Sequence, residues 1–163
     1  MGFTRKYSGS NRGLSLLEMV IALAILAVLA ATVIPVAEVS VKRTKELELR
    51  RSLRTMRTAI DEYKADFDRA VREKKITPDI DETGYPEELE ELVTGSDWGG
   101  LYRFKRKYLR RIPRDPFDKY DEGWGLRAYA DEPDSTVYGG GDIYDVFSQS
   151  DGIALDGTPY NTW

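Results

Sequence analysis

The chain has 163 residues, with 24 Lys and Arg against 28 Asp and Glu, and it contains neither cysteine nor histidine. Disulfide frameworks, thiolate metal sites and every catalytic or zinc motif that needs histidine are therefore excluded. We expect a protein that is not an enzyme, and the net charge of −4 argues against a general nucleic-acid binder.

A short basic segment leads directly into a long apolar run. Arg5, Lys6 and Arg12 supply the basic charge, and no acid stands among them. The run that follows, Met19 to Ala37, is long enough to span a bilayer at about 1.5 Å per residue. Glu18 stands at its entrance. Because a carboxylate at the edge of a membrane helix is unfavourable, we expect Glu18 to have a function.

Two simple interpretations of this segment are a secretory signal peptide, cut near Ala30 and Ala31, and a single-span anchor with its basic end in the cytoplasm. The apolar run exceeds the roughly 7–15 residues of a signal-peptide core, and a signal core would not begin with Glu18. The plain anchor leaves that carboxylate without a role. Both interpretations therefore explain less of the sequence than a third one.

The third interpretation rests on the junction Gly13-Leu14-Ser15-Leu16-Leu17-Glu18, which resembles the processing site of class III prepilins. The resemblance implies that a prepilin peptidase removes residues 1–13 and that the new N-terminus, Leu14, is methylated. Glu18 then stands fifth and Pro35 twenty-second, where type IV pilins and pseudopilins carry Glu and Pro. Leu14 itself departs from the phenylalanine that most members have.

Glu18 and Pro35 are the predicted assembly residues. Cleavage exposes an amine on Leu14, and the carboxylate of Glu18 on a neighbouring subunit would pair with it in a medium of low dielectric constant. The alternative is an acid that rests at the headgroup boundary. Around Pro35 the family's helix melts locally on assembly, whereas an ordinary membrane helix would only bend there.

The sequence predicts one helix from Leu14 to about Lys75, whose residues 14–38 form a transmembrane and fibre-core segment. Its second half has an apolar stripe with spacings of four and three residues, which favours a helix covering a sheet, although a coiled coil has the same spacing. Charged residues such as Arg50 and Arg57 are predicted on the solvent side. The stripe comprises Leu49, Leu53, Met56, Ile60, Tyr63, Phe67 and Ala70.

The remaining residues predict a small head. A short helix is expected over 87–93, and strands are expected over 108–112, 125–129 and 143–148. Charge also changes along the chain: residues 42–75 hold twelve basic and seven acidic side chains, a net of +5, and residues 76–163 hold nine and nineteen, a net of −10. We predict an α+β, type IV pilin-like fold in which residues 39–163 form the head, with the long helix packed on a small antiparallel sheet.

Within that superfamily the head resembles the major pseudopilin of type II secretion. The run Leu109 to Phe117 includes Pro113-Arg114-Asp115-Pro116-Phe117, and Asp145 to Ser148, Asp151-Gly152 and Trp163 match the group's C-terminal region. The resemblance implies a structural subunit of a periplasmic fibre that helps push folded proteins through the outer membrane. Its partners would be further copies, minor pseudopilins, the prepilin peptidase and an inner-membrane platform with its ATPase. The alternative is a type IV pilin of a surface fibre, whose head is commonly closed by a disulfide that this chain cannot form.

Two ligand hypotheses remain for the head. The pseudopilin resemblance implies calcium in the loop of Asp151 and Asp156, although the family's downstream acidic pair is absent and a solvated turn explains the same residues. The run Lys105 to Arg111 is basic and includes Tyr108, as in DNA-binding segments, but its alternation also fits a solvated strand. Since the acidic head would repel phosphate, no nucleic-acid partner is expected.

Overall fold

A computed structural model describes residues 15–163, which fall into two units. The first unit ends at Ser40, and the second comprises Val41–Trp163. One helix, α1, Leu16–Arg72, provides residues to both units. The predicted leader, including the cleavage site at Gly13 and Leu14, lies outside the described residues.

The helix α1 has defined signals at both ends. Ser15 precedes its first residue, and the backbone N–H of Glu18 donates a hydrogen bond of 3.2 Å to the Ser15 hydroxyl, as in a helix N-cap. At the other end Lys74 adopts the left-handed conformation with φ 56°, and Lys75 N–H donates to Ala70 O at 2.8 Å. This Schellman-type cap ends the helix at Arg72, three residues before the predicted boundary.

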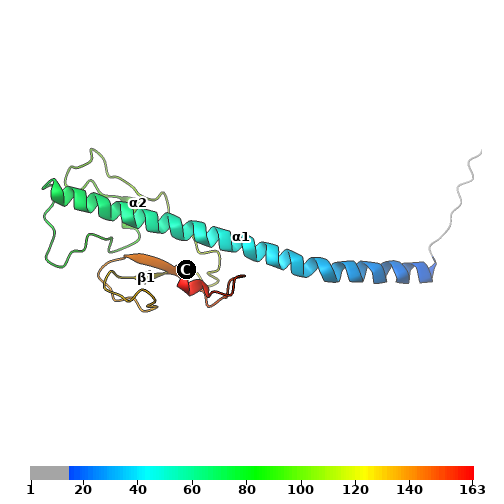
Figure 1. Ribbon diagram of the computed structural model, residues 1–163. Helices are drawn as coiled ribbons and strands as arrows, with labels where there is room; N and C mark the ends of the chain where they lie inside the picture. Colours follow the sequence, from blue (N-terminus) through cyan, green and yellow to red (C-terminus); the bar gives the residue numbers. More distant parts are fainter. Residues whose placement is uncertain (1–14) are drawn as a thin grey trace, which may run out of the picture. The chain divides into compact units, whose positions relative to one another are not determined.

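The predicted apolar stripe of α1 forms the core of the second unit. All seven of its residues are buried, and they pack with side chains from the rest of the head, among them Trp98, Leu109, Trp124 and Val146. Figure 1 shows the strands and the C-terminal turn along this half of α1. The prediction that the helix covers its own sheet is confirmed.

The sheet has two antiparallel strands, β1, Trp124–Arg127, and β2, Asp145–Ser148. Their register places Trp124 opposite Ser148 and Gly125 opposite Phe147. A side chain at Gly125 would collide with the Phe147 ring, which explains the glycine. Two predicted strands are therefore confirmed in place, though each is shorter than expected.

The predicted strand over 108–112 is wrong. The backbone N–H groups of Tyr108 and Leu109 both donate to Leu92 O, at 2.9 and 2.8 Å. This segment therefore binds a carbonyl group of a short helix and does not extend the sheet. That helix, α2, is Glu91–Thr94, a single turn in place of the predicted 87–93. Its N-terminal neighbours form a turn because Glu87 N–H and Glu88 N–H donate to the Glu91 carboxylate, at 3.1 and 3.2 Å.

Within the basic run, Arg106 and Tyr108 pack against α1, while Lys105, Lys107, Arg110 and Arg111 are exposed, and the run is not a strand. Asp66 of α1 is buried and accepts hydrogen bonds from Tyr102 Oη at 2.8 Å and from Tyr108 Oη at 2.7 Å. Arg106 donates to Asp66 at 3.1 Å and to Glu62 at 2.9 Å. These contacts, named here the Asp66 cluster, attach the loop of residues 96–108 to α1.

Candidate assembly site

The first half of α1 presents an uncovered apolar surface. Every side chain that the structure describes between Ser15 and Val41 is exposed, and Leu16 is 83 % exposed. By length and composition, α1 is the one helix among residues 15–163 that could cross a membrane. Since apolar burial is worth about 25 cal/mol per Å², this surface requires lipid or other protein chains around it.

Glu18 lies in the first turn of this exposed helix. The partial positive charge at a helix N-terminus favours a carboxylate there. The spacing Ser15-x-x-Glu18 is also that of a capping box, in which the serine hydroxyl and the glutamate serve each other's backbone N–H. The structure contains the serine half of that arrangement. The sequence prediction did not include Ser15, although the four-residue signature would have identified it.

Pro35 lies within α1, which continues through it to Arg72. Proline has no backbone N–H, so one helical hydrogen bond is missing at this point. The residue lies in the exposed apolar half, among Val33, Ile34 and Val36, which are 59–70 % exposed. A local weakness in the helix therefore coincides with its uncovered surface.

In the second unit, the C-terminal loop is attached to α1 through Glu46. The Glu46 carboxylate is buried and accepts hydrogen bonds from Tyr160 Oη at 2.9 Å and Leu155 N–H at 2.8 Å. Burial, followed by the hydrogen bond to Glu46, raises the pKa of Tyr160 to about 12. Tyr160 therefore keeps its proton and its bond to Glu46 at physiological pH.

Two arginines that were predicted on the solvent side also hold this loop. Arg57 donates to Asp145 at 2.6 Å and to Trp163 O at 3.0 Å. Arg50 pairs with Asp156 at 3.2 Å and lies over the Trp163 ring, 4.1 Å from its centroid. Arg50 and Arg57, on the polar side of α1, thus bind the C-terminal segment, a role that their predicted place outside the apolar stripe did not indicate.

We expect Glu46→Ala to loosen the C-terminal loop. The substitution leaves the buried Tyr160 hydroxyl without its acceptor, which costs about 2 kcal/mol. In detergent-solubilised full-length protein, thermal unfolding should begin several degrees lower and proteolysis after residue 150 should be faster. Glu48→Ala, at an exposed glutamate of the same helix, is the control; an equal effect of both substitutions would contradict this role of Glu46.

The run Pro113 to Phe117 is organised by a buried carboxylate. Asp115 accepts hydrogen bonds from Phe117 N–H at 2.8 Å and from the Ser148 hydroxyl at the end of β2. Phe117 in turn stacks on Tyr160, with 4.1 Å between ring centroids. Asp115 therefore joins two of the segments on which the pseudopilin resemblance rests, and Phe117 reaches the third through Tyr160, whose backbone N–H donates to Gly152 O at 3.0 Å.

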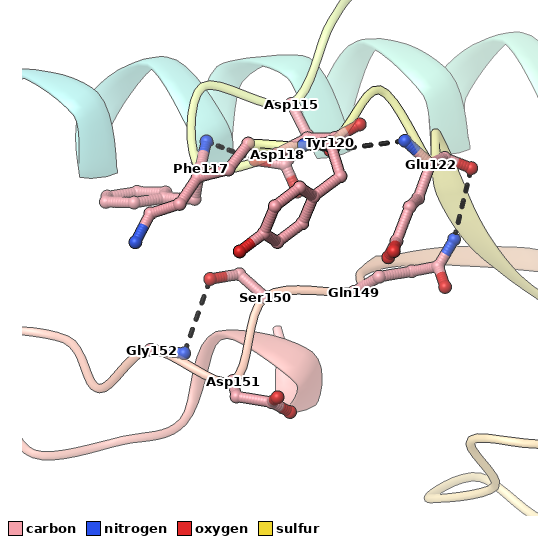
Figure 2. Close-up of a pocket in the computed structure, with 10 residues that line it drawn as sticks. Asp115, Phe117, Asp118, Tyr120, Glu122, Gln149, Ser150, Asp151 and Gly152 are labelled. Carbon is pink, nitrogen blue, oxygen red and sulfur yellow. Dashed lines mark hydrogen bonds between the residues drawn. The ribbon is translucent and has the colours of Figure 1, made fainter.

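Asp151 lines a surface pocket between this run and the C-terminal loop (Figure 2). Its carboxylate points away from those of Asp118 and Glu122, on the opposite wall. The other predicted ligand, Asp156, accepts hydrogen bonds from Thr158 and is paired with Arg50. Among residues 15–163 no three His, Cys, Asp or Glu side chains are grouped so that they could hold a metal ion, and calcium at Asp151 and Asp156 stays a prediction.

Asp118, in the same pocket, organises the loop of residues 118–123. The backbone N–H groups of Gly123, Glu122 and Tyr120 donate to its carboxylate, at 2.9, 3.2 and 3.0 Å. These bonds, that from Gly123 foremost, lower the pKa of Asp118. The charged carboxylate is thus the form that stabilises the loop.

This arrangement predicts an acid dependence. Because the pKa is lower in the folded chain, the stabilisation is present above the unfolded value of about 3.9 and is lost as pH falls through the folded value. We expect the stability of Asp118→Asn to fall less steeply than that of wild type below about pH 4. Thermal melts from pH 3 to pH 7 measure this slope, and identical slopes would contradict the assignment.

Comparison with known families finds a match to the N-terminal part of the chain. Residues 9–34 match the family model of the prokaryotic N-terminal methylation motif, the class III signal of type IV pilin-like proteins. Together with the apolar α1 and the small antiparallel sheet, this motif supports a membrane-anchored, type IV pilin-like fibre subunit that is processed by prepilin peptidase. No curated protein and no solved structure matches the chain significantly.

Proposed function

We propose that this protein is the major pseudopilin of a type II secretion system. It is a structural subunit without enzymatic activity, anchored in the inner membrane with its head in the periplasm. Polymerised into a periplasmic fibre, it helps push folded proteins through the outer membrane. The observation that carries the proposal is the contact of Asp115 and Phe117 with Ser148 and Tyr160, because it joins the segments that resemble this group into one unit.

Processing is the first step of the proposed cycle. Prepilin peptidase cuts after Gly13, the amine of Leu14 is methylated, and Glu18 of a neighbouring subunit pairs with that amine. Pro35 marks the place where the helix loosens on assembly. Mass spectrometry of the protein isolated from membranes tests the cut: a methylated N-terminal Leu14 is expected. An intact Met1, or a start beyond Ala30, would contradict the proposal.

Assembly involves the other components of the system. Copies of this chain join minor pseudopilins, and an inner-membrane platform with a cytoplasmic ATPase drives extension. Deletion of the gene is expected to leave secreted proteins in the periplasm. Complementation with the intact chain should restore secretion.

The second candidate is a type IV pilin of a surface fibre used for adhesion, motility or DNA uptake. The methylation motif is shared by both groups, which is why this candidate stands. The absence of cysteine favours the pseudopilin, because pilin heads are commonly closed by a disulfide. Loss of surface filaments without any secretion defect, seen by electron microscopy of the deletion strain, would favour the pilin.

Calcium belongs to the proposal as a separate element. Asp156 is paired with Arg50, so calcium bound at Asp151 and Asp156 would compete with this ion pair. Bound calcium would then raise the melting temperature of the head, and a chelator would lower it. A melting temperature that chelator leaves unchanged would remove calcium from the proposal without affecting the fibre function.

A further inference from the structure

Two surface pockets of the second unit have opposite chemistry. The acidic pocket, of about 700 Å³, is lined by six carboxylates and by tyrosine rings, and no lysine or arginine lines it. The basic pocket, of about 660 Å³, includes three arginines and a single acid, Glu48. The carboxylates of the acidic pocket belong to Asp79, Asp81, Glu82, Glu87, Glu91 and Asp142.

The acidic pocket has an aromatic wall that suits a guanidinium group. Tyr85 and Tyr129 stack with 5.8 Å between centroids, and Tyr144 stands perpendicular to both, at 5.2 and 5.5 Å. Tyr129 is 62 % exposed, so its ring is accessible. Planar guanidinium groups stack on such rings and bind carboxylates in the same contact, which lysine does less well.

The cations within the same unit do not fill this pocket. Lys64 is the cation recorded near the wall, 5.7 Å from the Tyr85 centroid, and it is paired with Asp68. Glu91 and Asp142 already accept hydrogen bonds from the unit itself. Asp81 and Glu87 are exposed, and their carboxylates have no cationic partner among the described residues 15–163.

The basic pocket supplies arginines of the matching kind. Arg51 of α1 and Arg111, at the end of the basic run that begins at Lys105, are exposed. Neither has an ion-pair partner within the part of the chain that the structure describes. Arg114 contributes a third guanidinium, which is paired with Asp121 in a highly exposed contact. Exposed pairs of this type are weak and can be exchanged.

The two pockets share no lining residue. Along α1, Thr55 borders the basic pocket and Tyr63 the acidic one, eight residues or about 12 Å apart. Because the two pockets are fixed at different places on one folded unit, the arginines of the basic pocket do not enter the acidic pocket of the same chain. A contact between two different patches on identical chains does not close on itself unless the rotation forms a ring, and it otherwise produces an open filament.

We propose that the acidic pocket of one subunit binds Arg51 and Arg111 of the next copy of this chain. The contact would join the heads of neighbouring subunits along the fibre. The inference rests on the proposed fibre function and adds a contact to it. The partner is a second copy because each chain carries both complementary pockets. This contact selects the orientation of neighbouring heads, whereas Glu18 acts at the apolar helices.

Disulfide crosslinking tests the contact directly, because the natural chain has no cysteine. Full-length protein with Ala130→Cys and Thr55→Cys, which line the two pockets and leave every charged residue in place, is produced in the membrane with the native secretion machinery and then oxidised. We expect a ladder of dimers, trimers and higher species on non-reducing gels. Each single variant can form only dimers, and the pair Asp134→Cys with Thr55→Cys is the matched control, since Asp134 is exposed and lies outside the acidic pocket.

A charge exchange provides a second test. Arg111→Glu is expected to reduce fibre yield about tenfold, which corresponds to about 1.4 kcal/mol, and adding Glu87→Arg in the same chain should restore most of it. If fibres form but the ladder is absent, or is equally strong in the control pair, the inference is wrong while the proposed function stands. If the unaltered chain forms no fibre with its native machinery, both fail.

Discussion

Replacement of Glu18 by alanine is expected to reduce incorporation of the subunit into fibres at least about tenfold, while membrane insertion and cleavage after Gly13 continue. The proposed reason is that cleavage exposes an amine on Leu14, which would be poorly solvated among packed apolar helices. At 4 Å and an effective dielectric constant near 20, a carboxylate stabilises it by about 4 kcal/mol before desolvation is subtracted. Fibre yield measured by shearing and electron microscopy, against subunit remaining in the membrane, gives the result.

Two variants separate this pairing from the role of Glu18 in its own helix. Ser15→Ala removes the helix cap but keeps the carboxylate, so it should cost about 1 kcal/mol of helix stability and leave most assembly intact. Glu18→Gln keeps the shape and removes the charge, so it should fail like alanine. Assembly of Glu18→Ala at the wild-type rate would overturn the pairing, and equal defects in Ser15→Ala would assign the effect to capping.

Replacement of Asp66 by alanine is expected to have the largest effect on the stability of the head. The buried carboxylate accepts hydrogen bonds from Tyr102, Tyr108 and Arg106. Its loss leaves the two tyrosine hydroxyls without this acceptor, whereas Arg106 still donates to Glu62. Breaking a buried charged network of this kind costs about 3 kcal/mol or more. Thermal unfolding of the detergent-solubilised full-length chain, followed by circular dichroism, should show a melting temperature lower by several degrees.

Glu62→Ala is the matched control for Asp66. Its side chain is 50 % exposed and pairs with the same Arg106, so its loss should change stability by less than about 1 kcal/mol. A second readout is the near-ultraviolet circular dichroism of the tyrosines, since Tyr102 and Tyr108 bind Asp66. This signal should change in Asp66→Ala and stay the same in Glu62→Ala. Equal melting temperatures for the two variants would contradict the prediction that the buried Asp66 contributes more to the stability of the head than the exposed Glu62.

The long helix and its core face could be predicted because their information is local. Spacings of three and four residues identify the buried stripe from Leu49 to Ala70 without any knowledge of its partners. The ends were less accurate, since the helix stops where Lys74 takes a left-handed conformation that glycine would normally signal. The two confirmed strands were likewise marked by short apolar runs between turn residues.

The contacts of the head could not be predicted in the same way. Tyr160 and Glu46 are 114 positions apart, and no local pattern connects them. The segment after Lys107 alternates like a strand, but its N–H groups donate to Leu92, a partner that only the three-dimensional arrangement supplies. Charged residues on the polar side of α1 looked solvated for the same reason, although Arg57 binds the C-terminus.

For the candidate site, the sequence was most informative at the N-terminus. The junction that begins at Gly13 predicted the class, and the methylation motif over residues 9–34 agrees with it. Cleavage at Gly13 and methylation of Leu14 remain predictions, as does calcium at Asp151 and Asp156. The capping signature Ser15-x-x-Glu18 is local as well, so the sequence alone indicates where the helix begins.

The uncovered apolar half of α1 bears on the energetics of growth and disassembly. In a bilayer this surface is already out of water, and packing it against other helices in a fibre exchanges one apolar environment for another. Assembly as proposed is therefore close to neutral in hydrophobic free energy, so polar contacts and external work must decide its direction. A fibre of this kind could therefore be extended or taken apart by changes in its polar contacts or in the work supplied, without a large hydrophobic barrier.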